Sequence, residues 1–330
     1  MNAAKSSTAT ATTATAKSGV TQASGVAVVG RFAPSPTGPL HAGSLLAAVG
    51  SYLQARSHGG RWLLRIEDVD ATRTVAGMES QILLTLERFG FEWDGPVVRQ
   101  SERRDRYAAA LAQLQAAGTV FRCECSRRDR LESQNSRGLG CVSECWDRQP
   151  VIGQTGIALR WRPTAATGSE RDRCATVSFD DLWQGPSRIE GLTDVVLRRR
   201  DGLHAYHLAV VVDDADQGVS QIVRGADLLE STGWHILLQR ALQAPRPEYG
   251  HLPVLTESDG RKLSKSSHAI ALDTRTAGPE LFLALQRLRQ QPPEPLAHAP
   301  VAQLWSWALG HWQPARLLGL SSLAADGRTH

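Results

Sequence analysis

The sequence predicts an α/β fold in which a parallel sheet is flanked by helices. Short apolar strands at residues 27–32 and 61–66 are each followed by a segment with helical periodicity, at 42–56 and 74–89. Alternation of this kind is typical of parallel strands joined by crossover helices. Ligands of such sheets bind beyond the carboxyl ends of the strands, so we expect the Pro/Gly-rich turn at 34–44 to be part of the functional site.

The middle of the chain interrupts this alternation. A helix is expected at 102–118, after which residues 119–150 are rich in Cys, Arg, Ser and Gly. Residues 157–200 have β-type patterning, and the Asp-Gly pair at 201–202 favours a hairpin turn. We therefore predict an inserted α+β subdomain at about 119–205.

The α/β pattern returns at 204–243, and a strand at about 251–255 leads into a polar loop at 257–268. The last fifty or so residues have short helical patterns separated by prolines. We divide the chain into a tail at 1–24, an α/β domain at 25–270 that contains the insertion, and a short helical region at 271–330.

Composition excludes several classes of protein. The 330 residues are 42% hydrophobic, which is enough for a real core, and the net charge is +4. No apolar run approaches the roughly 20 residues that span a bilayer, and no secretory signal is recognisable, so we expect no membrane partner. The five cysteines are odd in number and clustered, which favours a metal site in a reducing, cytoplasmic setting over disulfides.

The N-terminal tail at 1–24 consists mostly of Ala, Thr, Ser and Lys. Such a segment buries too little apolar area to offset the entropy of ordering, so we expect it to be disordered. A transit peptide is the alternative, because no acidic residue precedes Glu67, but the tail contains no Arg.

The first chemical motif is the strand-turn-helix segment at 31–44, RFAPSPTGPLHAGS. Gly43 allows a phosphate or an adenine to approach the backbone, and the helix start offers N–H groups and a positive dipole end. His41 can donate a hydrogen bond to a phosphate oxygen, and Ser44 completes the expected ATP-binding group. The alternative is an ordinary Pro/Gly turn with a capping His.

The second motif is KLSKS at 262–266, in the loop after the last strand. Lys262 and Lys265 can follow a moving triphosphate, because lysine is a flexible point charge. The alternative is a solvated charged loop. The lysine distribution favours ATP, since the only other lysines of the chain lie in the N-terminal tail, at Lys5 and Lys17.

Together the two segments resemble the paired signatures of class I aminoacyl-tRNA synthetases, which have a Rossmann-type (HUP) catalytic domain. Further motifs narrow the resemblance to the glutamyl/glutaminyl subgroup; they are LRIEDVD at 64–70, HAYHLAVVVDD at 204–214 and VRGADLL at 223–229. The resemblance covers about residues 26–270. Ser44 departs from it, because many class I enzymes have a second His there, which leaves more of the phosphate contacts to His41 and backbone donors.

A glutamate substrate needs a cation for its side-chain carboxylate and an anion for its ammonium group. Arg31 and Arg224 match the substrate arginines of the family, Glu67 matches its ammonium partner, and Tyr206 matches a residue of the same pocket. The signature segment adds the remaining candidates for the glutamate site, which are Phe32, Ala33, Pro34 and Ser35. For any one of these residues, a surface salt bridge or a core position is the alternative.

Cys123 and Cys125 are followed, after fifteen residues, by Cys141 and Cys145. Four thiolates on short loops are typical of a closed structural zinc site, so we expect one zinc ion at 123–145, while Cys174 is left over and inert. Buried cysteines without metal are the alternative. The module resembles that of the glutamyl-Q tRNA(Asp) synthetases, a family of shortened glutamyl-tRNA synthetase paralogues, in which a tyrosine commonly occupies the position of Cys141.

Only about 65 residues follow Ser266, so we expect a catalytic core without a standard anticodon-binding domain. The resemblance implies an enzyme, a monomer in our expectation, that activates L-glutamate with ATP and Mg²⁺ without tRNA. It implies transfer of the glutamate to the queuosine base at the anticodon wobble position of tRNA-Asp. The alternatives are a conventional glutamyl-tRNA synthetase-type ligase, a nucleotidyltransferase of the superfamily, and a non-catalytic, zinc-dependent RNA-binding module.

Overall fold

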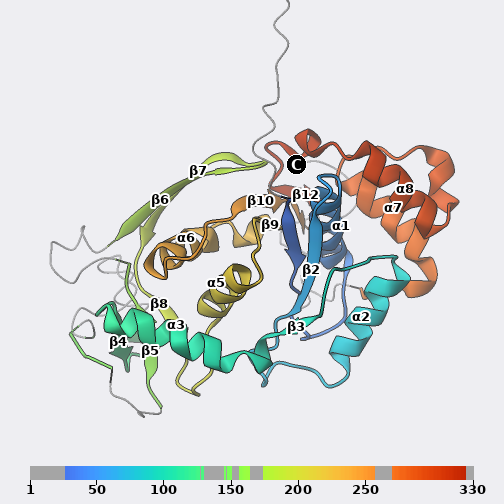
Figure 1. Cartoon of the computed structure of the whole chain (residues 1–330). Coiled ribbons are helices and arrows are strands. Elements are labelled where there is room, and N and C mark those ends of the chain that lie inside the picture. Colours follow the sequence, from blue (N-terminus) through green and yellow to red (C-terminus); the bar gives the residue numbers. More distant parts are fainter. Residues whose placement is uncertain are drawn as a thin grey trace, which may run out of the picture.

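The structure is a computed structural model (Figure 1). It describes residues 27–126, 128–129, 145, 147–150, 156–163, 174–256 and 270–324. Three of the predicted site residues, Cys141, Lys262 and Lys265, lie outside the described residues, as does the predicted disordered tail at 1–24.

The N-terminal half of the parallel sheet contains β1 (Val29–Phe32), β2 (Arg61–Ile66) and β3 (Val98–Arg99), paired in that order and all parallel. The helix α1 (Ala42–Arg56) connects β1 to β2, and α2 (Met78–Arg88) connects β2 to β3. The predicted bounds of α1 and β2 are confirmed. Both segments have strong local signals, since α1 has a capped start and β2 is a run of buried apolar side chains.

The second half of the sheet has the order β7-β6-β10-β9. Its strands are β6 (Ala175–Asp181), β7 (Gly185–Leu192), β9 (Gln221–Gly225) and β10 (Glu248–Leu252). β10 is parallel to β9 and to β6, whereas β6 and β7 form an antiparallel pair. Ser220 joins the two halves, because its N–H donates to the Val29 carbonyl at 3.0 Å and its hydroxyl accepts from the Val29 N–H at 2.9 Å.

Helices cover both faces of this sheet, so the predicted α/β class is confirmed. The helices α5 (Tyr206–Asp216) and α6 (Ser231–Ala241) lie on one side, and α1 lies on the other (Figure 1). Short 3-10 turns occur at Gln100–Glu102, Ala226–Leu228, Thr274–Thr276, Glu294–His298 and Pro314–Leu317.

A separate antiparallel sheet follows α3 (Arg104–Ala116) and has the order β4-β5-β8. Its strands are β4 (Val120–Cys123), β5 (Ala158–Trp161) and β8 (Val195–Arg198). Trp161 and Leu197 of this sheet pack against Tyr107 of α3 and Leu208 of α5 in one buried cluster. Residues 157–200 are β-rich as predicted, but β6 and β7 join the main sheet through β10, and only β4, β5 and β8 form the small sheet. The shared core fixes this small sheet against α3 and α5.

The C-terminal region packs on α1 rather than standing apart. It contains α7 (Ala277–Arg287), α8 (Val301–His311) and β12 (Ser322–Ala324), which pairs in parallel with β11 (Val254–Thr256) of the α/β domain. The Trp305 ring of α8 contacts Tyr52 of α1 and Phe91, with ring centroids 4.8 and 5.0 Å apart. Its indole N–H donates to the Phe89 carbonyl at 2.8 Å. The predicted short helices are confirmed.

Three of the differences between the predicted elements and the structure have local reasons. α2 begins at Met78 instead of 74, because the Asp70 carboxylate accepts from Thr72 and Arg73 and holds that segment in a turn. The strand predicted at 251–255 is two strands broken at Pro253, which has no N–H to donate. The turn at Gly202 is present, with φ of 85°, but α5 follows it instead of a full second strand.

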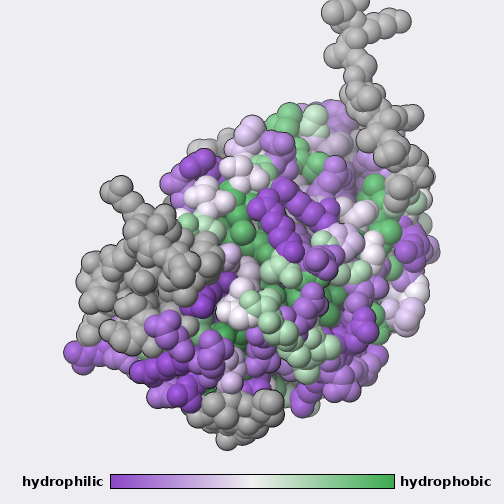
Figure 2. Space-filling view, turned by 60° about the vertical axis from the view of Figure 1, so that its left-hand side comes forward, coloured by the Kyte–Doolittle hydropathy of each residue, from purple (hydrophilic) through white to green (hydrophobic). Residues whose placement is uncertain are grey.

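The described residues contain no helix that is long and apolar enough to cross a membrane. On the face shown in Figure 2, hydrophobic residues lie near the middle, between hydrophilic ones.

Truncation of Trp305 tests how strongly the C-terminal helices are joined to the catalytic core. We expect Trp305→Ala to lower the free energy of unfolding by about 3–5 kcal/mol, because the side chain is buried and its truncation leaves a cavity. Urea denaturation would measure the change. The control is Leu309→Ala on the same helix, where the side chain is exposed and a change below about 0.5 kcal/mol is expected. Equal effects of the two substitutions would contradict this packing.

Candidate functional site

Three neighbouring cavities lie at the carboxyl end of β1 and β2. The first, of about 180 Å³, shares Ala47 and Gly225 with the second, of about 490 Å³. The second shares Glu67 and Tyr206 with the third, of about 310 Å³. This is the edge of the sheet at which the sequence places the site.

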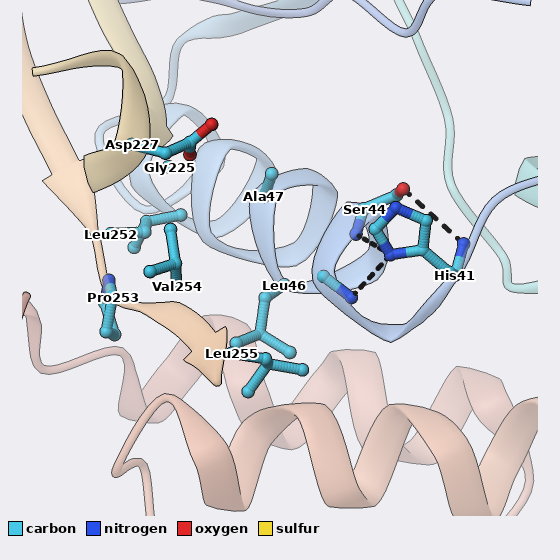
Figure 3. A pocket seen from close by; sticks show the side chains of 11 residues that line it. His41, Ser44, Leu46, Ala47, Gly225, Asp227, Leu252, Pro253, Val254 and Leu255 are labelled. Atoms are coloured by element: carbon cyan, nitrogen blue, oxygen red, sulfur yellow. Dashed lines mark hydrogen bonds between the residues drawn. The ribbon is translucent and has the colours of Figure 1, made fainter. Parts of the chain in front are cut away.

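The first cavity lies beside the start of α1 and contains three of the residues that we predicted for ATP binding (Figure 3). They are His41, Gly43 and Ser44. Residues 252–255, at the end of β10 and in β11, form its apolar side. An apolar wall beside a helix N-terminus has the chemistry expected for an adenine ring and its phosphates.

His41 is the N-cap of α1. Its Nδ1 accepts hydrogen bonds from the backbone N–H groups of Gly43 and Ser44, at 3.1 and 3.4 Å (Figure 3). The helix start was expected to offer its N–H groups to a ligand, but His41 caps two of them, as the alternative reading proposed for this side chain. Because Nδ1 accepts, the neutral ring carries its proton on Nε2. The ring can therefore be a cap and a donor at the same time.

The position of Gly43 has a steric reason. A Cβ atom at residue 43 would lie 3.1 Å from Cε1 and 3.2 Å from Nδ1 of His41, closer than side chains normally pack. Glycine therefore allows the His41 ring to fold back over the first turn of α1. The absence of a Cβ atom at residue 43 would also allow a ligand to approach the backbone closely, as the sequence suggested.

The second cavity brings together most of the residues predicted for glutamate. Its lining includes seven of the eight predicted residues, which are Arg31, Phe32, Ala33, Ser35, Glu67, Tyr206 and Arg224. Pro34 is not among the lining residues, but its carbonyl accepts from the Glu67 N–H at 3.0 Å and so positions that side chain.

Arg224, at the end of β9, is a buried cation surrounded by neutral acceptors. Its guanidinium donates to His251 Nε2 at 3.2 Å and to Thr232 Oγ1 at 2.8 Å, and it lies 3.2 Å from His235 Nδ1. Among the described residues, no carboxylate lies within 4.0 Å of this guanidinium. A buried positive charge without an anion is costly, so the cavity is electrostatically suited to an anionic ligand.

The two histidines beside Arg224 are held neutral. Burial and the charge of Arg224 keep the pKa of His235 well below its usual range. Burial also lowers the pKa of His251, although its Nδ1 lies 2.5 Å from the Asp181 carboxylate, which acts in the opposite direction. Neutral rings can accept from Arg224 without repelling it.

Arg31 already has a carboxylate partner. Its Nε donates to Asp214 Oδ1 at 3.3 Å, and its NH1 donates to the Val223 carbonyl at 3.1 Å. Arg65 donates to the same carboxylate oxygen at 2.8 Å. Burial opposes ionisation of Asp214, but these two guanidinium groups outweigh it and lower the pKa of the carboxyl group. Arg31 is thus fixed in place, which leaves Arg224 as the stronger anion-binding group.

Glu67 lies between the second and third cavities. Burial raises the pKa of its carboxyl group, against the lowering effect of Arg65, whose guanidinium is 3.4 Å away. A cationic ligand group beside Glu67 would favour the ionised form. Glu67, which the sequence predicts as the ammonium partner, is thus a carboxyl group whose charge Arg65 does not fully stabilise, so a ligand cation could bind to it.

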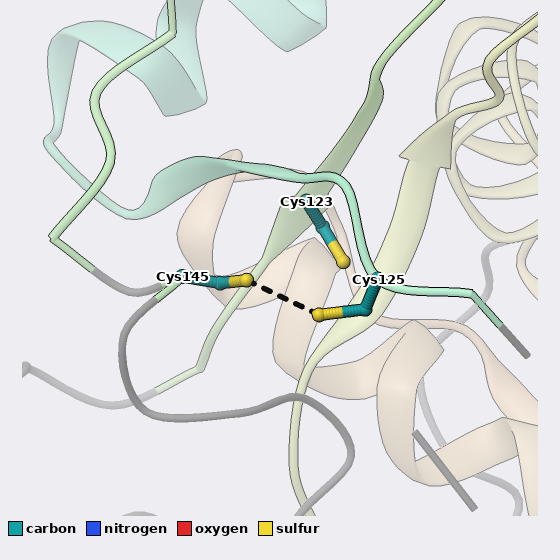
Figure 4. Close-up of side chains that lie close together, drawn as sticks. All are labelled: Cys123, Cys125 and Cys145. Atoms are coloured by element: carbon teal, nitrogen blue, oxygen red, sulfur yellow. Dashed lines mark hydrogen bonds between the residues drawn. The ribbon is translucent and has the colours of Figure 1, made fainter. Parts of the chain in front are cut away.

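Three thiol groups lie together in the insertion (Figure 4). The Sγ atoms of Cys123, Cys125 and Cys145 are all within 4.8 Å of one another, and those of Cys125 and Cys145 are 3.3 Å apart. Thiolates at such distances suit a soft or borderline metal ion such as zinc. Cys174, which the sequence leaves outside the metal site, packs against the buried cluster of Phe121, Cys123 and Cys145 and is not part of the three-thiol group.

Comparison with known proteins identifies the family. The profile described as "tRNA synthetases class I (E and Q), catalytic domain" matches residues 27–281. A glutamyl-Q tRNA(Asp) synthetase of Aromatoleum aromaticum is 49% identical over 86% of this chain and 88% of its own length. The homologue of the same name from Pseudomonas aeruginosa is 45% identical over 90% of this chain and 98% of its own length. The chain belongs to the glutamyl-Q tRNA(Asp) synthetase family.

Members of this family are class I synthetases, and so the chain is a ligase of a class that uses ATP. The fold of a glutamate tRNA ligase from Elizabethkingia meningosepticum is similar, with a TM-score of 0.67 and 24% identity over 90% of this chain and 67% of that one. The predicted resemblance, its glutamyl/glutaminyl subgroup and the class I catalytic fold are confirmed.

Sequence reasoning missed the residues that hold the glutamyl-Q synthetase site in shape. Arg65, Thr232, His235, His251 and Asp214 contact the predicted side chains, and Asp181 binds His251, but none of these residues was predicted for the site. Only Arg65 and Asp214 had a sequence signal, since they lie inside the motifs at 64–70 and 204–214. The others come together through the pairing of β10 with β9 and with β6, and through α6.

Neutral His235 makes stability depend on pH. The pKa of His235 in the folded protein lies well below the ordinary 6.5, so the unfolded chain binds more protons once the pH falls below about 6.5. We expect the free energy of unfolding to fall as pH is lowered from 6.5 toward 4.5. His235→Gln keeps an acceptor for Arg224 and should remove up to about 1.4 kcal/mol per pH unit of that slope. Urea denaturation at several pH values would measure it; an unchanged slope would contradict a neutral His235.

Proposed function

We propose that the enzyme activates L-glutamate with ATP, without tRNA, and transfers it to the queuosine base at the wobble position of tRNA-Asp. The observation that carries the glutamate part is Arg224, a buried cation without a carboxylate partner among the described residues, in the cavity next to His41. The acceptor is supported by the name that the homologues share, glutamyl-Q tRNA(Asp) synthetase.

Glutamate would occupy the second cavity. Its side-chain carboxylate pairs with Arg224, assisted by the fixed Arg31, and its ammonium group pairs with Glu67. Burial raises the pKa of Tyr206, so the tyrosine hydroxyl keeps its proton and can donate to a carboxylate oxygen. Phe32, Ala33 and Ser35 form the remaining wall. This arrangement discriminates against glutamine, because a neutral amide would leave the buried charge of Arg224 without an anion.

ATP with Mg²⁺ would occupy the first cavity. The glutamate α-carboxylate attacks the α-phosphorus, the bond to the β-phosphate oxygen breaks, and pyrophosphate leaves. The protein contributes positioning and charge stabilisation. The protonated Nε2 of His41 would donate to a phosphate oxygen, and Gly43 and Ser44 keep that ring in place. Lys262 and Lys265, outside the described residues, would neutralise the β- and γ-phosphates, as the sequence predicts.

Zinc would have a structural role. Cys123, Cys125 and Cys145 would bind it together with Cys141, which lies outside the described residues. Four thiolates leave no position open for a reacting water molecule, so the metal would stabilise the insertion and not take part in the reaction.

Glutamate activation can be tested by ATP–pyrophosphate exchange. We expect exchange with glutamate, but not with glutamine or aspartate, in the absence of tRNA. Arg224→Met should lower kcat/KM for glutamate at least about 30-fold, because a buried charge pair lost on truncation is worth about 2–5 kcal/mol. Arg240→Met, at an exposed position of α6, is the matched control and should keep normal activity. Equal activity of both variants would remove Arg224 from the glutamate site.

The acceptor is tested in the same preparation by charging labelled glutamate onto tRNA-Asp with and without queuosine. Label only on the modified tRNA is expected. Label on unmodified tRNA at its 3′ end would instead favour a conventional glutamyl-tRNA synthetase-type ligase and overturn this part of the proposal.

Zinc content can be measured by mass spectrometry of the native protein. We expect about one zinc ion per chain, and Cys123→Ser should lose most of it, because zinc prefers four thiolate ligands in such a site. Cys174→Ser is the matched control, since Cys174 packs beside the three-thiol group without belonging to it, and it should retain the metal. A Cys123→Ser protein with full zinc content would contradict this ligand set.

A further inference from the structure

Three side chains on adjacent parallel strands form a row that ends at the second cavity. Asp181 is the last residue of β6, His251 lies near the end of β10, and Arg224 lies near the end of β9. The strand register pairs Tyr249 with Asp181 and His251 with Arg224. Parallel strands bring their carboxyl ends to the same edge of a sheet. A carboxylate, an imidazole and a guanidinium are thereby placed in sequence, and the guanidinium lines the cavity.

Hydrogen bonds fix which oxygen of Asp181 faces the imidazole. Oδ1 accepts from the backbone N–H groups of Trp183 and Gln184 at 3.0 Å each, and from the backbone N–H of His251 at 3.2 Å. Oδ2 lies 2.5 Å from Nδ1 of the His251 ring. Burial opposes ionisation of Asp181, but the hydrogen bonds that it accepts outweigh burial and lower the pKa of the carboxyl group. An ionised carboxylate can only accept, so the proton between the two groups is on Nδ1 of the ring.

The contacts of the other ring nitrogen require the same tautomer. Nε2 of His251 lies 3.2 Å from Nε of Arg224, and a guanidinium nitrogen can only donate. Nε2 also lies 3.2 Å from the Thr232 hydroxyl, which accepts from NH2 of Arg224 at 2.8 Å. A proton on Nε2 would place two N–H groups against each other and leave one of them buried without an acceptor, which is unfavourable.

We propose that Asp181 and His251 are positioning residues for the glutamate site. Asp181 holds the ring proton of His251 on Nδ1, and the unprotonated Nε2 accepts from Arg224 and sets the direction of its guanidinium in the second cavity. The inference rests on the proposed function, in which Arg224 binds a carboxylate group of glutamate. Both residues act only through Arg224, because their side chains have no exposed surface and line none of the three cavities.

This arrangement supports a buried cation without occupying it. The negative charge of Asp181 lies one imidazole ring away from Arg224, and it partly offsets the cost of burying the guanidinium. A carboxylate in direct contact with Arg224 would compete with the ligand for the guanidinium, whereas a carboxylate behind a neutral ring does not. The distance between the two charges is therefore part of what keeps the cavity suited to an anionic ligand.

An isosteric substitution at residue 181 inverts the tautomer. In Asp181→Asn the amide oxygen takes the place of Oδ1, because that position accepts three backbone N–H groups, and the amide NH2 then faces Nδ1 of His251. Nδ1 must accept, so the ring proton moves to Nε2, opposite the N–H of Arg224. We expect KM for glutamate in ATP–pyrophosphate exchange to rise at least about 10-fold, because a donor replaces the acceptor of a charged group. KM for ATP should stay within about 2-fold, because neither residue lines the first cavity.

Nitrogen NMR of the histidine ring measures the tautomer directly. In the wild-type protein the proton of His251 is expected on Nδ1, and in Asp181→Asn it is expected on Nε2. The signal is assigned by its loss in His251→Gln. A wild-type ring with its proton on Nε2 would overturn the proposal, whatever the stability or activity of Asp181→Asn.

A double substitution tests whether Asp181 acts through the ring. His251→Gln keeps an acceptor oxygen for Arg224 but has no tautomers. Adding Asp181→Asn to His251→Gln should therefore change KM for glutamate by less than about 2-fold, since two residues that act as a unit are not additive. Equal effects of Asp181→Asn in both backgrounds would overturn the proposal, because they would indicate a structural effect that is independent of the ring.

The matched control is Asp180→Asn, which removes the same charge from the neighbouring, exposed position of β6. It should leave both KM values and the ring spectrum unchanged, and a rise in KM for glutamate as large as that of Asp181→Asn would contradict a specific role for Asp181. Absence of glutamate-dependent exchange in the wild type would overturn the proposed function, while the ring spectrum would still test the tautomer.

Discussion

The geometry of the site depends on one buried carboxylate. Asp214 lies near the end of α5, is 2% exposed, and accepts from Arg31 of β1 and Arg65 of β2 through the same oxygen. Three elements that are far apart in sequence are thus joined at one charge. Loss of one partner from such a buried ion group typically costs about 3–5 kcal/mol, because the remaining charge is left in a medium of low dielectric constant. The same contact fixes the direction of Arg31 in the second cavity.

A second carboxylate of α5 extends this network to the insertion. Asp213 accepts from the Tyr107 hydroxyl and from Arg103 Nε, at 2.9 and 2.6 Å, as well as from Gln100. α3 leads directly into the antiparallel sheet, so these bonds set the position of the insertion relative to the cavities. Neighbouring residues 213 and 214 therefore fix two different side chains at the cavities, Arg31 and Gln100.

Arg224, in contrast to Arg31, has no charged partner among the described side chains. Every side-chain partner described for this guanidinium is neutral, and burial keeps both histidines unprotonated. The protein thus pairs Arg31 with an internal carboxylate, whereas no carboxylate pairs with Arg224 among the described residues. Arg31 therefore has a fixed position, and the surroundings of Arg224 suit the carboxylate ligand that is proposed above. This difference is not visible in the sequence, where Arg31 and Arg224 have equal standing.

The sequence by itself determined the α/β class, the bounds of α1 and β2, and a set of ATP and glutamate candidates of which most line the first two cavities. These features depend on local signals, namely helical periodicity, strand hydrophobicity and short motifs. The tertiary structure decided which N–H groups His41 caps, that Cys174 packs against the cluster of Phe121, Cys123 and Cys145, and that Gln100 donates to Asp213. It also decided that His251 and Asp181, 70 residues apart, support Arg224. Such contacts form only when strands distant in sequence pair, so no local pattern encodes them.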